Sequence, residues 1–132
     1  MADHDSRERF LALSEAVIGA FALIASLLEA LPVPVIIPDI VRVAEDHGDP
    51  KDALLALNRV RAVVEDEPIS EFHKRAWEHM LLDWFAAYET LTLVQLAGPA
   101  PWRLDVAEFA LNRLVTWAEV IENDEEPDDS QS

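Results

Sequence analysis

Three prolines, Pro32, Pro34 and Pro38, interrupt a run of valines and isoleucines in the segment 31–40 (LPVPVIIPDI). Proline fixes φ and lacks a backbone N–H, and it pushes the preceding residue toward extended geometry. No helix can therefore continue through this segment. A helix before it must end there, and the chain must pass to its next element as an extended connector.

The connector carries four large apolar side chains: Val33, Val35, Ile36 and Ile37. An exposed strip of this kind would be a costly apolar patch. One interpretation is that the connector crosses the end of a helical bundle and buries these side chains in the core, as most large apolar residues are buried. The alternative is that they form a docking strip for a partner. The first interpretation is favoured.

Apolar periodicity and cap signals predict helices on both sides of the connector. Gly48 and Pro32 are expected to act as stop signals. The expected helices are a first one from the Asp5 cap to Leu31, a short one from the Asp39 cap to about His47, Pro50–Glu65, about Ser70–Ala97, and a last one from the Asp105 cap to about Asn123.

No segment shows sustained alternation of apolar and polar residues, so no sheet is expected. The predicted fold class is all-α: an antiparallel four-helix bundle-like domain with one additional short helix. This single domain covers residues 1–123. Residues 124–132 (DEEPDDSQS) form an acidic tail, which we expect to be disordered because like charges repel.

Two of the expected helices carry apolar residues on more than one side. The first has a narrow polar stripe marked by Glu8, Glu15 and Glu29, and is otherwise apolar nearly all round. On the long helix, Leu81 and Phe85 point away from the side that carries its tryptophans. A single small domain has difficulty covering both helices, which predicts a homodimer that associates through them.

The last helix has one apolar side, which we expect to face the core: Val106, Phe109, Ala110, Leu114, Trp117 and Ile121. Trp102 lies in the rigid turn PAPW before that helix. The candidate residues for interaction with a partner are Val33, Val35, Ile36, Ile37, Leu81, Phe85 and Trp102.

The charge is strongly negative: 26 acidic residues against 10 lysines and arginines give a net −16. Such a surface repels nucleic-acid phosphates and anionic lipid, so neither direct nucleic-acid binding nor membrane binding is expected. It attracts a basic protein partner. The alternative is a halophile host, whose proteins are all acidic for solubility at high salt, and the sequence does not distinguish these two interpretations.

Motifs for catalysis are not found in the sequence. It has no cysteine, no glycine-rich phosphate loop and no nucleophile elbow, so the chain is not expected to be an enzyme. His79 and Asp83, spaced i,i+4, are weak candidates for a metal site. A metal needs three or four ligands, and no Glu-x-x-His pair supplies them, so no metal and no cofactor is expected.

The N-terminus lacks the basic start of a signal peptide, and the most apolar run, Ala16–Leu28, is shorter than the roughly 20 residues that span a bilayer. We therefore expect a cytoplasmic protein. The leading functional hypothesis is a non-enzymatic interaction module that acts as an adaptor, regulator or chaperone-like protein. The alternatives are a DNA mimic that inhibits a nucleic-acid-binding protein, and a metal- or ligand-binding bundle that uses His73, His79 and Asp83.

Overall fold

The computed structural model describes residues 2–123, and within this range every regular element is an α-helix. The predicted all-α class is therefore confirmed, whereas the predicted acidic tail, 124–132, lies outside the described residues. The helices are α1 (Ala2–Glu29), α2 (Ile40–His47), α3 (Lys51–Glu65), α4 (Glu71–Ala97) and α5 (Pro101–Asn123).

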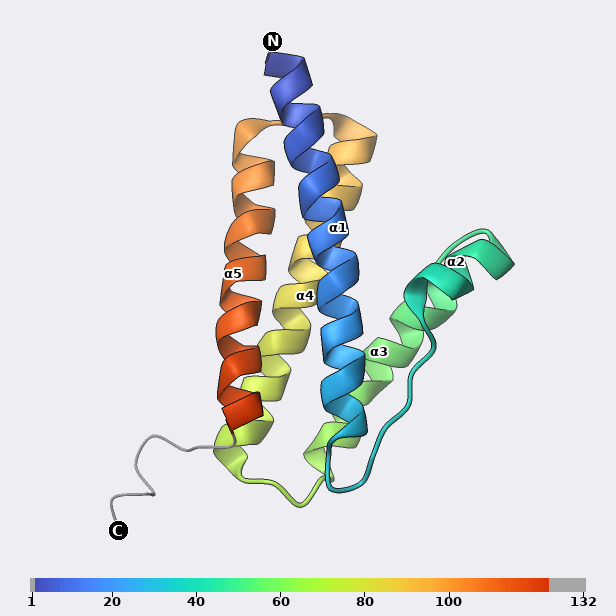
Figure 1. Cartoon of the computed structure of the whole chain (residues 1–132), viewed down its shortest axis with the longest axis vertical. Helices are drawn as coiled ribbons and strands as arrows, with labels where there is room; N and C mark the ends of the chain where they lie inside the picture. The colour runs from blue at the N-terminus through green and yellow to red at the C-terminus, as the bar shows by residue number, and fades with distance from the viewer. Residues whose placement is uncertain (1, 124–132) are drawn as a thin grey trace.

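Three of the helices, α1, α4 and α5, pack against one another side by side (Figure 1). The other two form a hairpin: α3 packs on α4 and α2, and α2 touches α1. In Figure 1, α3 diverges from α4 as it approaches α2. Among the described helices α3 contacts neither α1 nor α5, so a four-helix bundle is not confirmed. We describe the fold as a three-helix unit with an attached α2–α3 hairpin.

The sequence of α3 explains why it has so few neighbours. Its buried residues, Ala53, Leu57, Val60 and Val64, follow an i, i+4, i+7, i+11 pattern. Such a stripe is narrow and covers one neighbouring helix, whereas the interior helix of a bundle needs a wider apolar surface. The hairpin therefore lies on the outside of the three-helix unit.

The core is organised around the tryptophans of α4. Trp77 and Trp84 are almost completely buried. The ring of Trp84 meets the edge of Phe21 at 5.3 Å between centroids, and its Nε1–H donates a hydrogen bond to the carbonyl oxygen of Val17 at 2.9 Å. This bond satisfies the one polar atom of a buried indole and fixes α1 against α4.

The second apolar side of α4 is covered by α3. Glu78 of α4 pairs with Arg61 of α3 at 2.7 Å, and Phe85 lines a cavity together with Leu54 of α3. Leu81 lies on the same side of α4 and is fully buried. The two-sided apolar character of α4 is thus largely satisfied within one chain, and does not by itself require a partner.

Helix ends follow local signals in the middle of the chain. The side chain of Asp39 accepts hydrogen bonds from the backbone N–H groups of Val41 and Arg42, and Gly48 ends α2 at φ 82°, where a residue with a Cβ would be strained. Ser70 caps α4 by accepting a hydrogen bond from the N–H of His73. These three predicted signals are confirmed.

Two predicted starts are wrong. The first helix begins before Asp5, at Ala2, and the last helix begins before Asp105, at Pro101. Pro101 stands at the first helical position, where the missing N–H costs nothing and the fixed φ favours the helix. Trp102 therefore belongs to α5 rather than to a turn before it.

The connector between α1 and α2 is half in the core. Val35 and Ile37 pack against the core, whereas Val33 and Ile36 are exposed. The backbone N–H of Val33 donates to Oε1 of Glu67, a side chain that is itself buried in the turn between α3 and α4. This hydrogen bond ties the connector to the turn that follows α3.

Candidate interaction surfaces

The seven predicted interaction residues do not form one site. Val33, Ile36 and Trp102 are exposed. Three others, Val35, Ile37 and Phe85, are half-buried against the core, and Leu81 is inaccessible to a partner because the chain's own side chains cover it. Trp102 lies near the start of α5, at the opposite end of the three-helix unit from the start of the connector (Figure 1).

The exposed side of α5 carries three large apolar residues in an i, i+4, i+7 stripe. Trp102 is 64% exposed, Val106 48% and Phe109 61%. The expectation that Val106 and Phe109 face the core is wrong, because a neighbouring stripe of leucines and alanines occupies the core. The buried residues of α5 are Leu104, Ala107, Ala110, Leu111, Leu114 and Ala118.

Contacts between α4 and α5 set the register of this antiparallel pair. The ring of His79 stacks on Trp117 at 4.8 Å between centroids, and Asp83 pairs with Arg113 at 3.0 Å. Residues 79 and 83 of α4 therefore lie level with residues 117 and 113 of α5, so each step forward along α4 corresponds to an equal step back along α5.

Continued along the two helices, this register places Phe109, Val106 and Trp102 level with Ala87, Thr90 and Val94, beside the edge of α4 that Ala86, Thr90 and Leu93 form. Together they make up a surface that we call the α4–α5 face: Ala86, Thr90, Leu93, Trp102, Val106 and Phe109.

The α4–α5 face contains no acidic residue. The charged groups that border this face are paired or cationic. Arg113 pairs with Asp83 and lies 5.4 Å from the ring centre of Phe109, Arg103 lies 5.7 Å from the ring centre of Trp102, and Asp105 pairs with Arg9. In a chain with a net charge of −16, an uncharged apolar surface is the least repulsive place for a second acidic molecule to approach.

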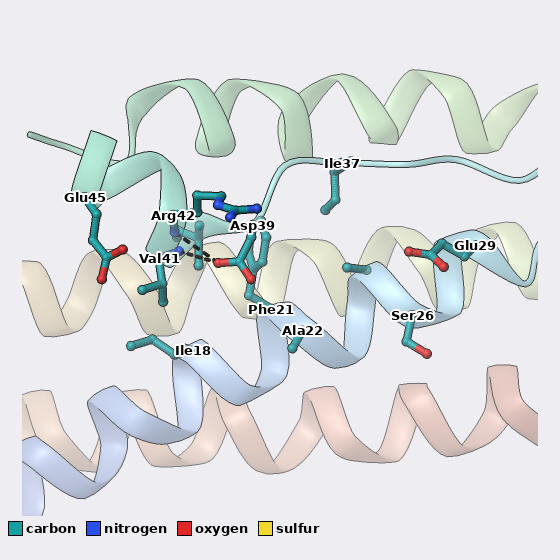
Figure 2. Close-up of a pocket in the computed structure, with 12 residues that line it drawn as sticks. Ile18, Phe21, Ala22, Ser26, Glu29, Ile37, Asp39, Val41, Arg42 and Glu45 are labelled. Carbon is teal, nitrogen blue, oxygen red and sulfur yellow. Dashed lines mark hydrogen bonds between the residues drawn. The ribbon is translucent and has the colours of Figure 1, made fainter. Parts of the chain in front are cut away.

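A second surface is a groove between α1 and α2, which we call the α1–α2 groove. It encloses about 600 Å³ and is bounded by α1, the end of the connector and the first turns of α2 (Figure 2). Ile18 of α1 lies opposite Val41 of α2 in this view, and Ala22 lies further along α1, nearer Asp39. Ile40 is buried between the helices and fixes their separation.

Charged residues border the α1–α2 groove along its length. Figure 2 shows Glu45 at one end, Asp39 in the middle and Glu29 at the other end. Arg42 is the one cation among the lining residues. The carboxylate of Asp39 also caps α2, so the N-terminal N–H groups of that helix offset part of its charge.

Two arginines outside both surfaces connect the helices. Arg9 of α1 donates to Asp105 and Glu108 of α5 at 2.7 and 2.6 Å, and these hydrogen bonds, above all the one to Asp105, raise the pKa of Arg9. The hydrogen bond to Glu78 likewise raises the pKa of Arg61. Both side chains are charged at any physiological pH, so these pairs serve structure rather than titration.

The structure gives the candidate metal ligands other partners. His79 stacks on Trp117, and Asp83 pairs with Arg113, so the i,i+4 pair does not form. His73 is buried, and its Nδ1 lies 3.0 Å from the hydroxyl of Ser70. Within residues 2–123 no three histidine, cysteine or acidic side chains lie close enough together to hold a metal ion.

The apolar character of the first helix extends beyond the run Ala16–Leu28. The segment His4–Glu29 is long enough to cross a membrane, and its most apolar 18-residue window has a mean hydropathy of 2.1. One third of that window is buried within the chain. The buried part includes Val17, Phe21, Ile24 and Leu28, which pack into the core.

Comparison of the chain with protein-family models, with curated proteins and with solved structures gives no match. The proposals below therefore depend on the chain's own surfaces.

Proposed function

We propose that this protein is a non-catalytic, homodimeric interaction module in which the α4–α5 face joins two copies. The observation that carries the proposal is the exposure of Trp102, Val106 and Phe109 in one stripe of α5. Monomeric soluble proteins rarely expose contiguous apolar patches, and large ones mark sites of association. The acidic remainder of the surface is left free for a basic protein partner.

The size of the patch suits the centre of a dimer interface. Trp102 and Phe109 each leave about three-fifths of the side chain exposed. Aromatic side chains bury 150–250 Å², so these two rings offer roughly 200–300 Å² per copy. A standard interface buries about 800 Å² on each partner, with an apolar centre and a polar rim. The rings alone therefore supply about a third of one side.

A second copy fits the charge of the face as well as its shape. Two chains of charge −16 repel each other at most orientations. A two-fold interface brings the same patch of each chain together, so an uncharged patch avoids direct contact between carboxylates. Dimerisation through α4 and α5 replaces the sequence-based expectation of dimerisation through the first and long helices.

Membrane insertion of α1 plays no part in this proposal. The large apolar residues of α1 that face α4, such as Val17 and Phe21, already pack around Trp84. Its apolar character therefore serves the core of the chain's own fold.

Sedimentation velocity over a range of protein concentrations tests the proposal. We expect the wild-type protein to sediment with an apparent mass of twice the 14.8 kDa of one chain. The double variant Val106→Glu, Phe109→Glu should sediment as a monomer. The matched control is Leu11→Glu, Val63→Glu, which places the same charges on exposed apolar positions of α1 and α3. A monomeric wild type, or equal loss of the dimer in the control, would contradict the proposal.

A further inference from the structure

We propose that the α1–α2 groove binds an amphipathic helix of a partner protein that carries lysines or arginines beside its apolar face. This inference rests on the proposed interaction function and names the kind of partner. It concerns a different surface from the α4–α5 face, so the two can fail separately.

The floor of the groove suits a helix. Ala22, Ala25 and Ser26 of α1 are small, so the backbone of a bound helix can approach closely, since interaxial distances depend on the side chains at the contact. Ile18, Ile37 and Val41 surround these positions and supply apolar contacts.

The length of the groove defines the length of the ligand. Along α1 the lining runs from Ile18 to Glu29. At a rise of 1.5 Å per residue this stretch is roughly 17 Å long, which corresponds to about three turns of a bound helix. A helix of this length presents apolar residues at i, i+3, i+4 and i+7 to a groove, which is a recurrent mode of peptide recognition.

The negative charge at the rim of the groove favours a positively charged ligand. Three carboxylates, those of Glu29, Asp39 and Glu45, face a single guanidinium, that of Arg42. Within residues 2–123 neither Glu29 nor Glu45 takes part in an ion pair. Glu29 and Glu45 stand at opposite ends of the groove (Figure 2), where they can pair with cations that flank a short apolar face.

The same charge argues against a second copy as the occupant. The chain has 26 acidic and 10 basic residues, so two copies that met at this acidic rim would repel each other. A basic helix from another protein gains attraction from both the rim and the net charge, and its association is fast and sensitive to salt.

A designed peptide provides the probe. It is a three- to four-turn helix with leucines on one face and lysines beside them, labelled for fluorescence anisotropy. One control peptide has glutamate at each lysine position, and another has the same composition in an order without an apolar face. We expect the leucine–lysine helix to bind, with affinity that falls as salt is raised, and both controls to bind at least tenfold more weakly.

Variants of the protein locate the binding site. The double variant Glu29→Gln, Glu45→Gln removes the uncommitted rim charges, and Ala22→Trp fills the floor. The matched controls are the double variant Glu65→Gln, Glu119→Gln and the single variant Ala12→Trp, which make equal changes at exposed positions outside the groove. We expect roughly tenfold weaker binding for each groove variant and less than a twofold change for its control.

Three outcomes would overturn the proposal: no binding of the basic peptide, equal binding of the acidic peptide, or equal losses in the groove and control variants. The last result would mean attraction by net charge alone. Sedimentation of the same variants keeps the two proposals apart, because groove variants should remain dimeric and the Val106→Glu, Phe109→Glu variant should still bind the peptide.

Discussion

The three-helix unit and the α2–α3 hairpin are stabilised in different ways. In the unit, α4 buries Trp77 and Trp84 against α1 and α5, and each of the three helices contacts the other two. The hairpin packs on α4 only through the narrow apolar stripe of α3, and α2 makes a small contact with α1. Regions with few buried contacts open at lower free energy than the core of the same molecule. The hairpin should therefore open without unfolding the unit.

The difference gives the two proposed surfaces different physical characters. The α4–α5 face lies entirely on the unit, where Asp83–Arg113 and His79–Trp117 fix the register, so it is a rigid surface. The α1–α2 groove has one wall on the unit and the other on the hairpin, so its width depends on how α2 is held. A rigid face suits a permanent dimer, and an adjustable groove suits partner helices of differing sequence.

The largest effect is expected at the centre of the unit. Trp84→Ala removes a fully buried ring, its contact with Phe21 and its hydrogen bond to Val17, and should lower the free energy of unfolding by about 3–5 kcal/mol. Urea denaturation followed by circular dichroism measures the loss. The control on the same helix is Leu96→Ala, which is 81% exposed and should change stability by less than about 0.5 kcal/mol.

The next effect should separate the hairpin from the unit. Leu57→Ala removes a fully buried side chain from the stripe between α3 and α4, at a cost of about 2–4 kcal/mol to the docked hairpin. In native-state hydrogen exchange we expect faster exchange throughout α2 and α3, with the amides of α5 nearly unchanged. Equal acceleration in all five helices would show that the hairpin and the unit form one cooperative structure.

Loss of the hydrogen bond between the connector and the turn after α3 should reduce stability by a smaller amount. Glu67→Ala leaves the N–H of Val33 without its carboxylate acceptor, which should cost about 1–3 kcal/mol. The same variant should alter peptide binding in the groove, because the connector leads directly into α2. Glu65→Ala, at an exposed position of α3, is the control and should have almost no effect on either stability or binding.

The smallest effect is expected for an exposed ion pair of the unit. Arg9→Ala removes the link from α1 to Asp105 and Glu108, and should cost less than about 1 kcal/mol because water and salt screen these groups. The pKa of Arg9 is raised on folding, so its contribution is complete below its unfolded pKa and persists across the neutral range. The difference between wild type and variant should shrink as salt is raised.

Local signals allowed much of the helix pattern to be predicted from the sequence. Asp39, Gly48 and Ser70 act through hydrogen bonds and φ angles within one turn, so their effect does not depend on the rest of the fold. The two wrong helix starts have the same local origin, because the cap signals at Asp5 and Asp105 compete with sequences that extend the helices further.

The surfaces could not be predicted in the same way, because they depend on which of two apolar stripes the neighbouring helices cover. On α5, Val106, Phe109 and Leu114 were expected inside, yet of these three only Leu114 is buried, together with Leu104, Leu111 and three alanines. The alanines at positions 107, 110 and 118 could have indicated which side of α5 is buried, because close packing of α5 against α4 requires small side chains. Leu81 is buried for the converse reason: α3 covers it.

A distance between two copies tests the central proposal most directly. The chain has no cysteine, so a single introduced cysteine carries one spin label per copy. We expect a label at Asn112→Cys, one turn beyond Phe109 on α5, to report a short, well-defined distance to its counterpart in the other copy, and a label at Arg59→Cys on α3 to report a longer one. A dimer with the shorter distance at Arg59, or no distance between copies at either position, would contradict association through the α4–α5 face.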